Sequence, residues 1–108
     1  MCDHKILDHS EHGYVIRCEK CKHLQIAFGT IAISLTEKQL YEFMQAIKEY
    51  FETYKYYECR TEKIIRIPTV NQSILLVYSL NELETLIHII EKAHMSLEIE
   101  KLLATDEN

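Results

Sequence analysis

Two cysteines separated by two residues, Cys18-Glu-Lys-Cys21, constrain the fold of this chain more than any other feature. A two-residue spacer lets both thiolates reach one metal ion from a tight turn, and the N–H groups of such a turn stabilise the thiolate charge. The residues on both sides, Tyr14–Arg17 and Leu24–Phe28, have the composition and alternation of strands. The sequence therefore predicts a zinc knuckle between two strands.

Potential metal ligands are concentrated near the start of the chain. Seven of the first 23 residues are Cys or His, whereas the other 85 contain one Cys and two His. Zinc in structural sites takes four thiolate or imidazole ligands in a tetrahedron. Side chains two apart in an extended segment point the same way, so Cys2 and His4 can chelate together. We therefore predict a structural Zn²⁺ bound by Cys2, His4, Cys18 and Cys21, with His9, His12 and His23 as alternative ligands.

Thiol–disulfide exchange between Cys18 and Cys21 is an alternative use of the motif. A redox Cys-x-x-Cys normally opens a helix, whose N-terminus lowers the pKa of the first thiol. Here a strand-like segment follows, which favours zinc. Four protein ligands leave no position for water or substrate, so we expect a protein that is not an enzyme. Cys59 lies far from the other cysteines in the sequence, and we expect a free thiol without a role.

The residues after the knuckle indicate a hairpin followed by a helix. Leu24–Phe28 and Ile31–Leu35 alternate as strands, and Gly29-Thr30 between them fits a type II′ turn. Thr36-Glu-Lys-Gln39 is a capping box that predicts a helix start. The apolar stripe of this helix is Leu40, Phe43, Met44, Ile47, Phe51 and Tyr54. A tyrosine cluster marks its end, with packing against the core favoured over a binding surface: Tyr50, Tyr54, Tyr56 and Tyr57.

The second half repeats this order. Strands are expected near Lys63–Pro68 and Ile74–Tyr78, and Ser79-Leu-Asn-Glu82 is a second capping box. The helix behind it is expected to run to about Leu103, with a core face of Leu83, Leu86, Ile87, Ile90, His94 and Leu97. Residues after 104 are expected to fray.

These patterns predict a single α+β domain over residues 1–108. We divide it into a zinc-binding segment (1–23), a first ββα unit (24–57) and a second ββα unit (58–108). The two units are expected to form one antiparallel sheet with both helices on one face.

Composition limits the classes of partner. The formal net charge is -5 and there is no block of basic residues, which disfavours nucleic-acid binding. A zinc-ribbon nucleic-acid regulator is still an alternative, with Lys5, Arg17, Lys20 and Lys22 as its candidate cations. No stretch reaches 18 apolar residues and no signal peptide is evident, so we expect no membrane span and a cytoplasmic location.

The outward side of the second hairpin indicates a protein partner. Four of its residues would leave an apolar surface in water unless another chain covers it: Ile64, Arg66, Leu75 and Val77. We expect a protein-interaction module that binds either a different protein or a second copy of this chain.

Two segments resemble a known family. The run from Gly13 to Thr30, which contains Cys-x-x-Cys and then Gln-Ile-Ala-Phe-Gly-Thr, and the later Ser79-Leu-Asn-Glu-Leu-Glu-Thr-Leu86 are similar to a small bacterial family of domains of unknown function. Its members are about as long as this chain. The resemblance implies a bacterial cytoplasmic protein and supplies no activity.

Overall fold

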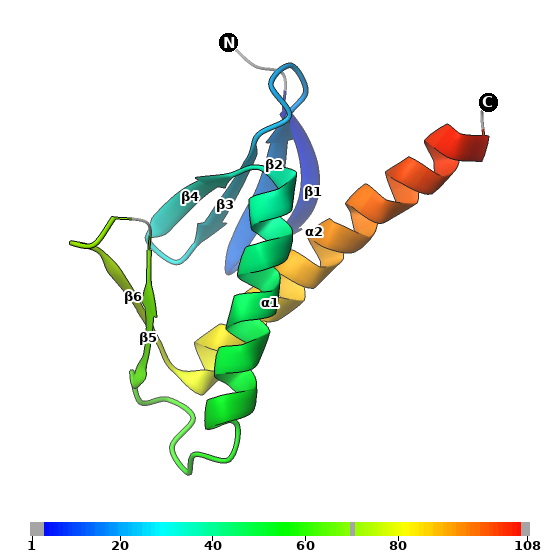
Figure 1. Ribbon diagram of the computed structural model, residues 1–108. Coiled ribbons are helices and arrows are strands. Elements are labelled where there is room, and N and C mark those ends of the chain that lie inside the picture. Colours follow the sequence, from blue (N-terminus) through cyan, green and yellow to red (C-terminus); the bar gives the residue numbers. More distant parts are fainter. Residues whose placement is uncertain (1–3, 70, 107–108) are drawn as a thin grey trace.

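The computed structural model describes residues 4–69 and 71–106 as a mixed α+β fold (Figure 1). The elements follow in the order β1 (His4–Ser10), β2 (Gly13–Cys18), β3 (Leu24–Phe28), β4 (Ile31–Leu35), α1 (Glu37–Tyr54), β5 (Ile65–Pro68), β6 (Leu75–Tyr78) and α2 (Leu80–Asp106). Strands β1 to β4 form one antiparallel sheet in sequence order, and β5 and β6 form a separate antiparallel hairpin.

The prediction of one sheet built from two ββα units is therefore wrong. The N-terminal segment supplies β1, so β1 and β2 extend the first hairpin into a four-stranded sheet. The β5–β6 hairpin instead packs its own apolar side against the common core through Ile65, Ile67, Leu76 and Tyr78. The rings of Phe28 and Tyr78 meet edge to face with centroids 5.6 Å apart, which joins β3 to β6. Burial raises the pKa of Tyr78 to about 12.

The alternation of buried and partly buried residues along β3 shows which side of the four-stranded sheet faces the core. Leu24, Ile26 and Phe28 are buried, whereas Gln25 and Ala27 between them are only partly buried. Both helices lie on the same side of this sheet (Figure 1), and α1 buries Leu40, Met44 and Ile47 in the shared core. The predicted placement of both helices on one face is confirmed for the four-stranded sheet.

Both helices begin at the predicted capping boxes. The Gln39 N–H donates to Thr36 Oγ1 at 3.1 Å, and the Thr36 N–H donates to Gln39 Oε1 at 2.9 Å. The same exchange links Ser79 and Glu82 at 3.2 and 2.9 Å. These bonds satisfy donors that the first helical turn leaves without partners, which explains why each helix starts there.

The predicted tyrosine cluster divides into two pairs. Tyr50 and Tyr54 pack against the core, whereas Tyr56 and Tyr57 are exposed, Tyr56 by 87%.

Gly29 has a φ of 61°, as the predicted type II′ turn requires.

Within the described residues, no helix is long and apolar enough to cross a membrane.

The C-terminal end of α2 is more exposed than its start. Leu83, Leu86 and Ile90 are almost completely buried, but every described side chain from Glu98 to Ala104 is exposed except Glu100, which is half-buried. Figure 1 shows this end (orange to red) extending beyond the sheet. Among the described side chains, the buried apolar face of α2 therefore ends at Leu97.

Candidate metal centre

The predicted knuckle is a tight turn at the end of β2. The Cys18 N–H donates to the His23 carbonyl at 2.9 Å, and the Lys22 N–H donates to the Cys18 carbonyl at 2.8 Å. Lys22 has a φ of 62°, which is unusual for a residue with a side chain. The chain therefore reverses over residues 19–22 and enters β3 at Leu24.

The turn directs an N–H group at the first sulfur. The Cys21 N–H donates to Cys18 Sγ at 3.5 Å. Cys18 is disulfide-bonded, so the acceptor of this hydrogen bond is a disulfide sulfur. Cys18 is 6% exposed, whereas Cys21 is exposed, so the two sulfurs differ in their access to solvent.

His4 lies directly opposite Cys18 in the β1–β2 ladder. Directly opposed side chains lie on the same face of the sheet, with Cβ atoms about 5 Å apart. His4 and Cys18 also line one pocket of about 140 Å³ on the side of the sheet away from the helices, together with Ile16, His23, Leu24, Gln25 and Ser34. The fold thus brings two of the four predicted ligands together across 13 intervening residues.

The structure does not describe all four predicted metal ligands. Cys2 lies outside the described residues, and within residues 4–69 and 71–106 no group of three or more Cys, His, Asp or Glu side chains could hold a metal ion. Cys18 is disulfide-bonded, whereas Cys21 and Cys59 are free. The Cys18–Cys21 disulfide that the redox alternative would use is therefore not formed, and Cys59 is a free thiol as predicted.

The three alternative ligands lie at different distances from the knuckle. His23 lines the same pocket as His4 and Cys18. His9 pairs with Tyr14, four residues along β2 from Cys18, or about 13 Å at the usual rise of a strand. His12 follows β1 at that distant end, where its carbonyl accepts from the Gly29 N–H at 3.2 Å. Only His23 of the three is close enough to assist the knuckle.

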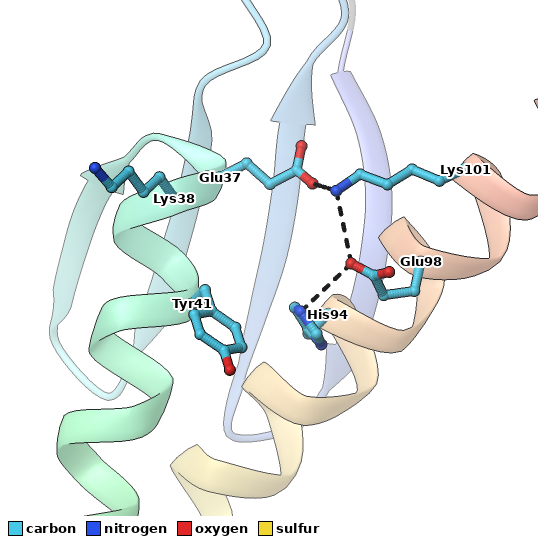
Figure 2. Close-up of a pocket in the computed structure, with 6 residues that line it drawn as sticks. All are labelled: Glu37, Lys38, Tyr41, His94, Glu98 and Lys101. Atoms are coloured by element: carbon cyan, nitrogen blue, oxygen red, sulfur yellow. Dashed lines mark ion pairs between the residues drawn. The ribbon is translucent and has the colours of Figure 1, made fainter.

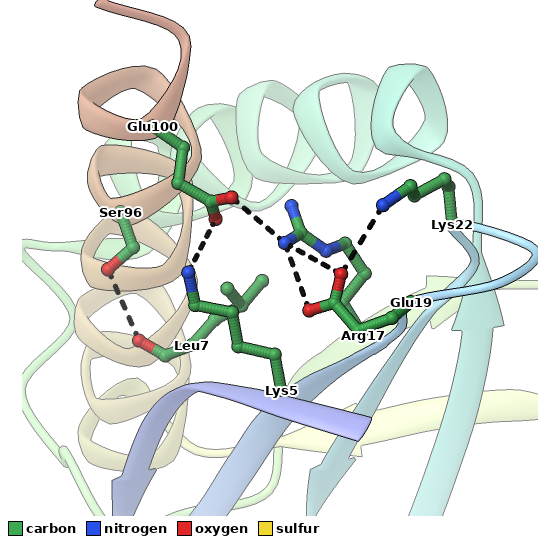
Figure 3. Close-up of polar contacts among 7 residues, drawn as sticks. All are labelled: Lys5, Leu7, Arg17, Glu19, Lys22, Ser96 and Glu100. Carbon is green, nitrogen blue, oxygen red and sulfur yellow. Dashed lines mark hydrogen bonds and ion pairs between the residues drawn. The ribbon is translucent and has the colours of Figure 1, made fainter. Parts of the chain in front are cut away.

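Ion pairs occupy most of the basic side chains around the knuckle (Figure 3). Arg17 Nη2 lies 2.9 Å from Glu100 Oε1 and 3.1 Å from Glu19 Oε1. Lys22 pairs with Glu19 at 3.3 Å, and Lys5 pairs with Glu100 at 3.2 Å. Three of the four candidate cations for nucleic acid are therefore neutralised by carboxylates of the same chain, which weakens the zinc-ribbon regulator alternative.

A second surface feature is a groove of about 650 Å³ between α1 and α2 (Figure 2). The rings of Tyr41 and His94 lie 5.5 Å apart in it, and His94 contacts Glu98 at 3.6 Å. Lys101 pairs with both Glu37 and Glu98, which ties the two helices together. His94 was predicted on the core face, and it lies at the edge of that face with its polar atoms in this ion-pair cluster.

Comparison with models of protein families finds a match over nearly the whole chain. The model of a family described as "Family of unknown function (DUF6686)" matches residues 1–107. No curated protein and no solved structure matches the chain.

Proposed function

Because the chain belongs to this family of unknown function, we propose its function from its own residues: a zinc-stabilised, non-enzymatic α+β protein that binds another protein. The proposed structural ion is held by Cys2, His4, Cys18 and Cys21. The observation that carries the proposal is the placement of His4 opposite Cys18, beside a turn whose Cys21 N–H donates to the Cys18 sulfur.

The chemistry of this donor set fits zinc. Two thiolates from a knuckle with further Cys and His ligands form the usual tetrahedron of a structural site. A metal-binding Cys18 must be a thiolate, so the proposed site requires the reduced protein, because the disulfide and the metal bond exclude each other. Four protein ligands would exclude substrate from the metal, which is why we propose a structural and not a catalytic ion.

Metal analysis of protein purified under reducing conditions tests this site. We expect one zinc ion per wild-type chain and loss of tight zinc binding in the Cys18→Ser and Cys21→Ser variants. The matched control is Cys59→Ser, because Cys59 is an exposed free thiol whose hydrogen-bond partners, Thr61 and Glu62, lie far along the chain from the knuckle. Zinc-free wild-type protein, or equal zinc content in all four proteins, would contradict the proposal.

The outer face of the β5–β6 hairpin is the proposed protein-binding surface. Leu75 and Val77 are exposed by 52% and 41%, and Ile74 beside them by 44%. Arg66 lies opposite Val77 and is also exposed. Ile64, which was predicted on this face, is half-buried and packs against the core. This face presents neighbouring apolar side chains to water, which is the kind of surface that another protein covers.

A second copy of the chain is the occupant that sedimentation can test directly. We expect the wild-type protein to form a concentration-dependent dimer and Val77→Glu to shift it to monomer, because a carboxylate would be desolvated in the apolar contact. Met95→Glu is the matched control, since Met95 is exposed by 61% on α2 outside this face. Monomer alone at high concentration would exclude the homodimer and leave a different protein as the partner.

A further inference from the structure

The strand β4 (Ile31–Leu35) forms one edge of the four-stranded sheet, and β1 forms the other (Figure 1). Within residues 4–69 and 71–106, β4 pairs only with β3, so one of its two sides has no strand partner. An unpaired strand edge presents a row of backbone N–H and C=O groups to which another strand can bind.

The register of the β3–β4 hairpin determines which backbone groups lie on the free side of β4. Phe28 pairs with Ile31 across the two-residue turn, and the pair that flanks such a turn exchanges both of its backbone hydrogen bonds. Hydrogen-bonded and non-hydrogen-bonded pairs then alternate along the ladder, so Ile33 also bonds to β3. The N–H and C=O groups of Ala32 and Ser34 therefore point to the free side.

The edge of β4 lacks the features that protect strand edges from pairing. Its sequence, Ile-Ala-Ile-Ser-Leu, contains no charged residue and no proline, and its register with β3 is regular. The other edge strand, β1, contains Lys5 and Asp8, and its ladder is irregular between Ile6 and Asp8. Because charged side chains and bulges discourage the addition of a strand, β4 is the edge of this sheet that can accept one.

The core-facing side chains of β4 are incompletely covered. Leu24 and Ile26 of β3 are each only 1% exposed. Their partners in β4, Leu35 and Ile33, also pack against the core, but they are half-buried. A strand added beside β4 would remove more of this apolar surface from water, which is favourable.

The sequence of β4 is complementary to itself in the antiparallel orientation. When Ile33 lies opposite Ile33 of a second copy, Ile31 lies opposite Leu35, and Ala32 lies opposite Ser34. Directly opposed residues share a face of the sheet, so apolar side chains meet on the core side and small side chains meet on the outer side. A shift of one residue would place core-facing side chains opposite outward-facing ones, which the burial pattern disfavours.

The β4 edge adjoins the proposed protein-binding surface. A cleft of about 330 Å³ lies where the β3–β4 turn approaches β6, and Ile31, Leu75 and Val77 all line it. Leu75 and Val77 are the exposed apolar residues of the outer face of the β5–β6 hairpin. A second copy seated on the β4 edge would therefore cover part of this face as well.

We propose that two copies of the chain associate by antiparallel pairing of their β4 strands, with Ile33 at the two-fold axis. The two four-stranded sheets then form one continuous sheet, in which Ala32 and Ser34 exchange backbone hydrogen bonds between the copies. Both copies use the same edge, so the dimer is closed and no β4 edge stays unpaired. This pairing rests on the proposed function, because it specifies how a second copy occupies the protein-binding surface.

Hydrogen exchange at single amides tests the pairing directly. We expect the N–H groups of Ala32 and Ser34 to exchange at least about tenfold more slowly in the dimer than in dilute, monomeric protein, because they gain a partner only in the dimer. The N–H of Ile33 bonds to β3 in both states and is the internal reference. Sedimentation of the same samples measures the fraction of dimer.

The Ser34→Pro variant removes one donor from the free edge without removing a hydrogen bond to β3. We expect its dimer to have a Kd at least about tenfold higher than that of the wild type, because the two-fold axis places the loss twice in one contact. The matched control is Ser34→Ala, which keeps the backbone N–H and should dimerise as the wild type does. If circular dichroism shows that Ser34→Pro does not fold, Ala32→Lys provides the test by placing a charge on the exposed edge, with the same expected direction.

The outcomes separate β4 pairing from the proposed function. A wild-type dimer whose Ala32 and Ser34 amides exchange as fast as in the monomer would overturn β4 pairing and leave the hairpin face as the binding surface. A folded Ser34→Pro variant that dimerises as tightly as the wild type would do the same. Wild-type protein that stays monomeric at high concentration would also overturn β4 pairing, and a different protein would then be the proposed partner. Loss of the dimer in Ser34→Pro but not in Val77→Glu would support β4 pairing and remove the hairpin face from the contact.

Discussion

Chelation of zinc from the reduced protein is expected to lower its free energy of unfolding by several kcal/mol, because the apparent binding free energy of a structural zinc ion is on the order of 10 kcal/mol. Among the described residues of β1, only Leu7 is a buried apolar side chain. The outermost strand therefore has little apolar anchoring, and the metal would attach it to β2 through His4 and Cys18. Urea unfolding with and without chelator measures the difference.

The Cys18→Ser variant separates loss of metal from other effects of the chelator. Its unfolding midpoint should be lower than that of the wild type and should not change on chelation. Cys59→Ser should behave as the wild type under both conditions, because Cys59 is exposed between α1 and β5. An unchanged midpoint for a wild-type protein that demonstrably loses its zinc would show that the ion does not stabilise the fold.

Gly13→Ala should destabilise the protein by about 3 kcal/mol or more, the range of severe overpacking. A Cβ atom at Gly13 would lie 2.0 Å from the Ala27 carbonyl oxygen and 3.1 Å from Phe28 Cα. These are backbone atoms of β3, so they cannot move aside as a flexible side chain would. Because Gly13 pairs with Phe28 in the ladder, relief of the clash requires β2 and β3 to separate.

Gly29→Ala is the comparison for this variant. Gly29 has a φ of 61°, but a Cβ atom there would meet nothing within 4 Å. The expected cost is about 1–2 kcal/mol, the strain of a left-handed residue with a side chain. Denaturant unfolding of both variants ranks them, and a larger loss for Gly29→Ala than for Gly13→Ala would contradict the packing described at Gly13.

Local patterns were sufficient to predict most elements of this fold. The helix starts at Thr36 and Ser79 follow from side chains that bond N–H groups three residues away, so the information lies within one turn. The same holds for the alternation of Leu24–Phe28 and the turn at Gly29. The strand β1 was missed because its apolar residues Ile6 and Leu7 are adjacent, and the ladder is irregular between Ile6 and Asp8.

The candidate metal site was also predictable only in part. The Cys-x-x-Cys turn is local, and the sequence predicted it between two strands. The placement of His4 opposite Cys18 depends on the register of β1 against β2, which a broken alternation does not specify. The ion pairs of Arg17 with Glu19 and Glu100 had no signal in the sequence, because each of the three residues looks like an ordinary surface charge until α2 is placed over the sheet.

The sequence by itself determined the α+β composition, the two capped helices, the hairpin turn and the clustering of potential zinc ligands near the N-terminus. Only the tertiary structure decided that the strands form two sheets, that His4 faces Cys18, and that Arg17 reaches Glu100 across 83 residues. The physical reason is the distance along the chain over which each interaction acts. Periodicity and capping depend on neighbours within about one helical turn, whereas strand partners and ion pairs depend on which apolar surfaces bury one another when the whole chain folds.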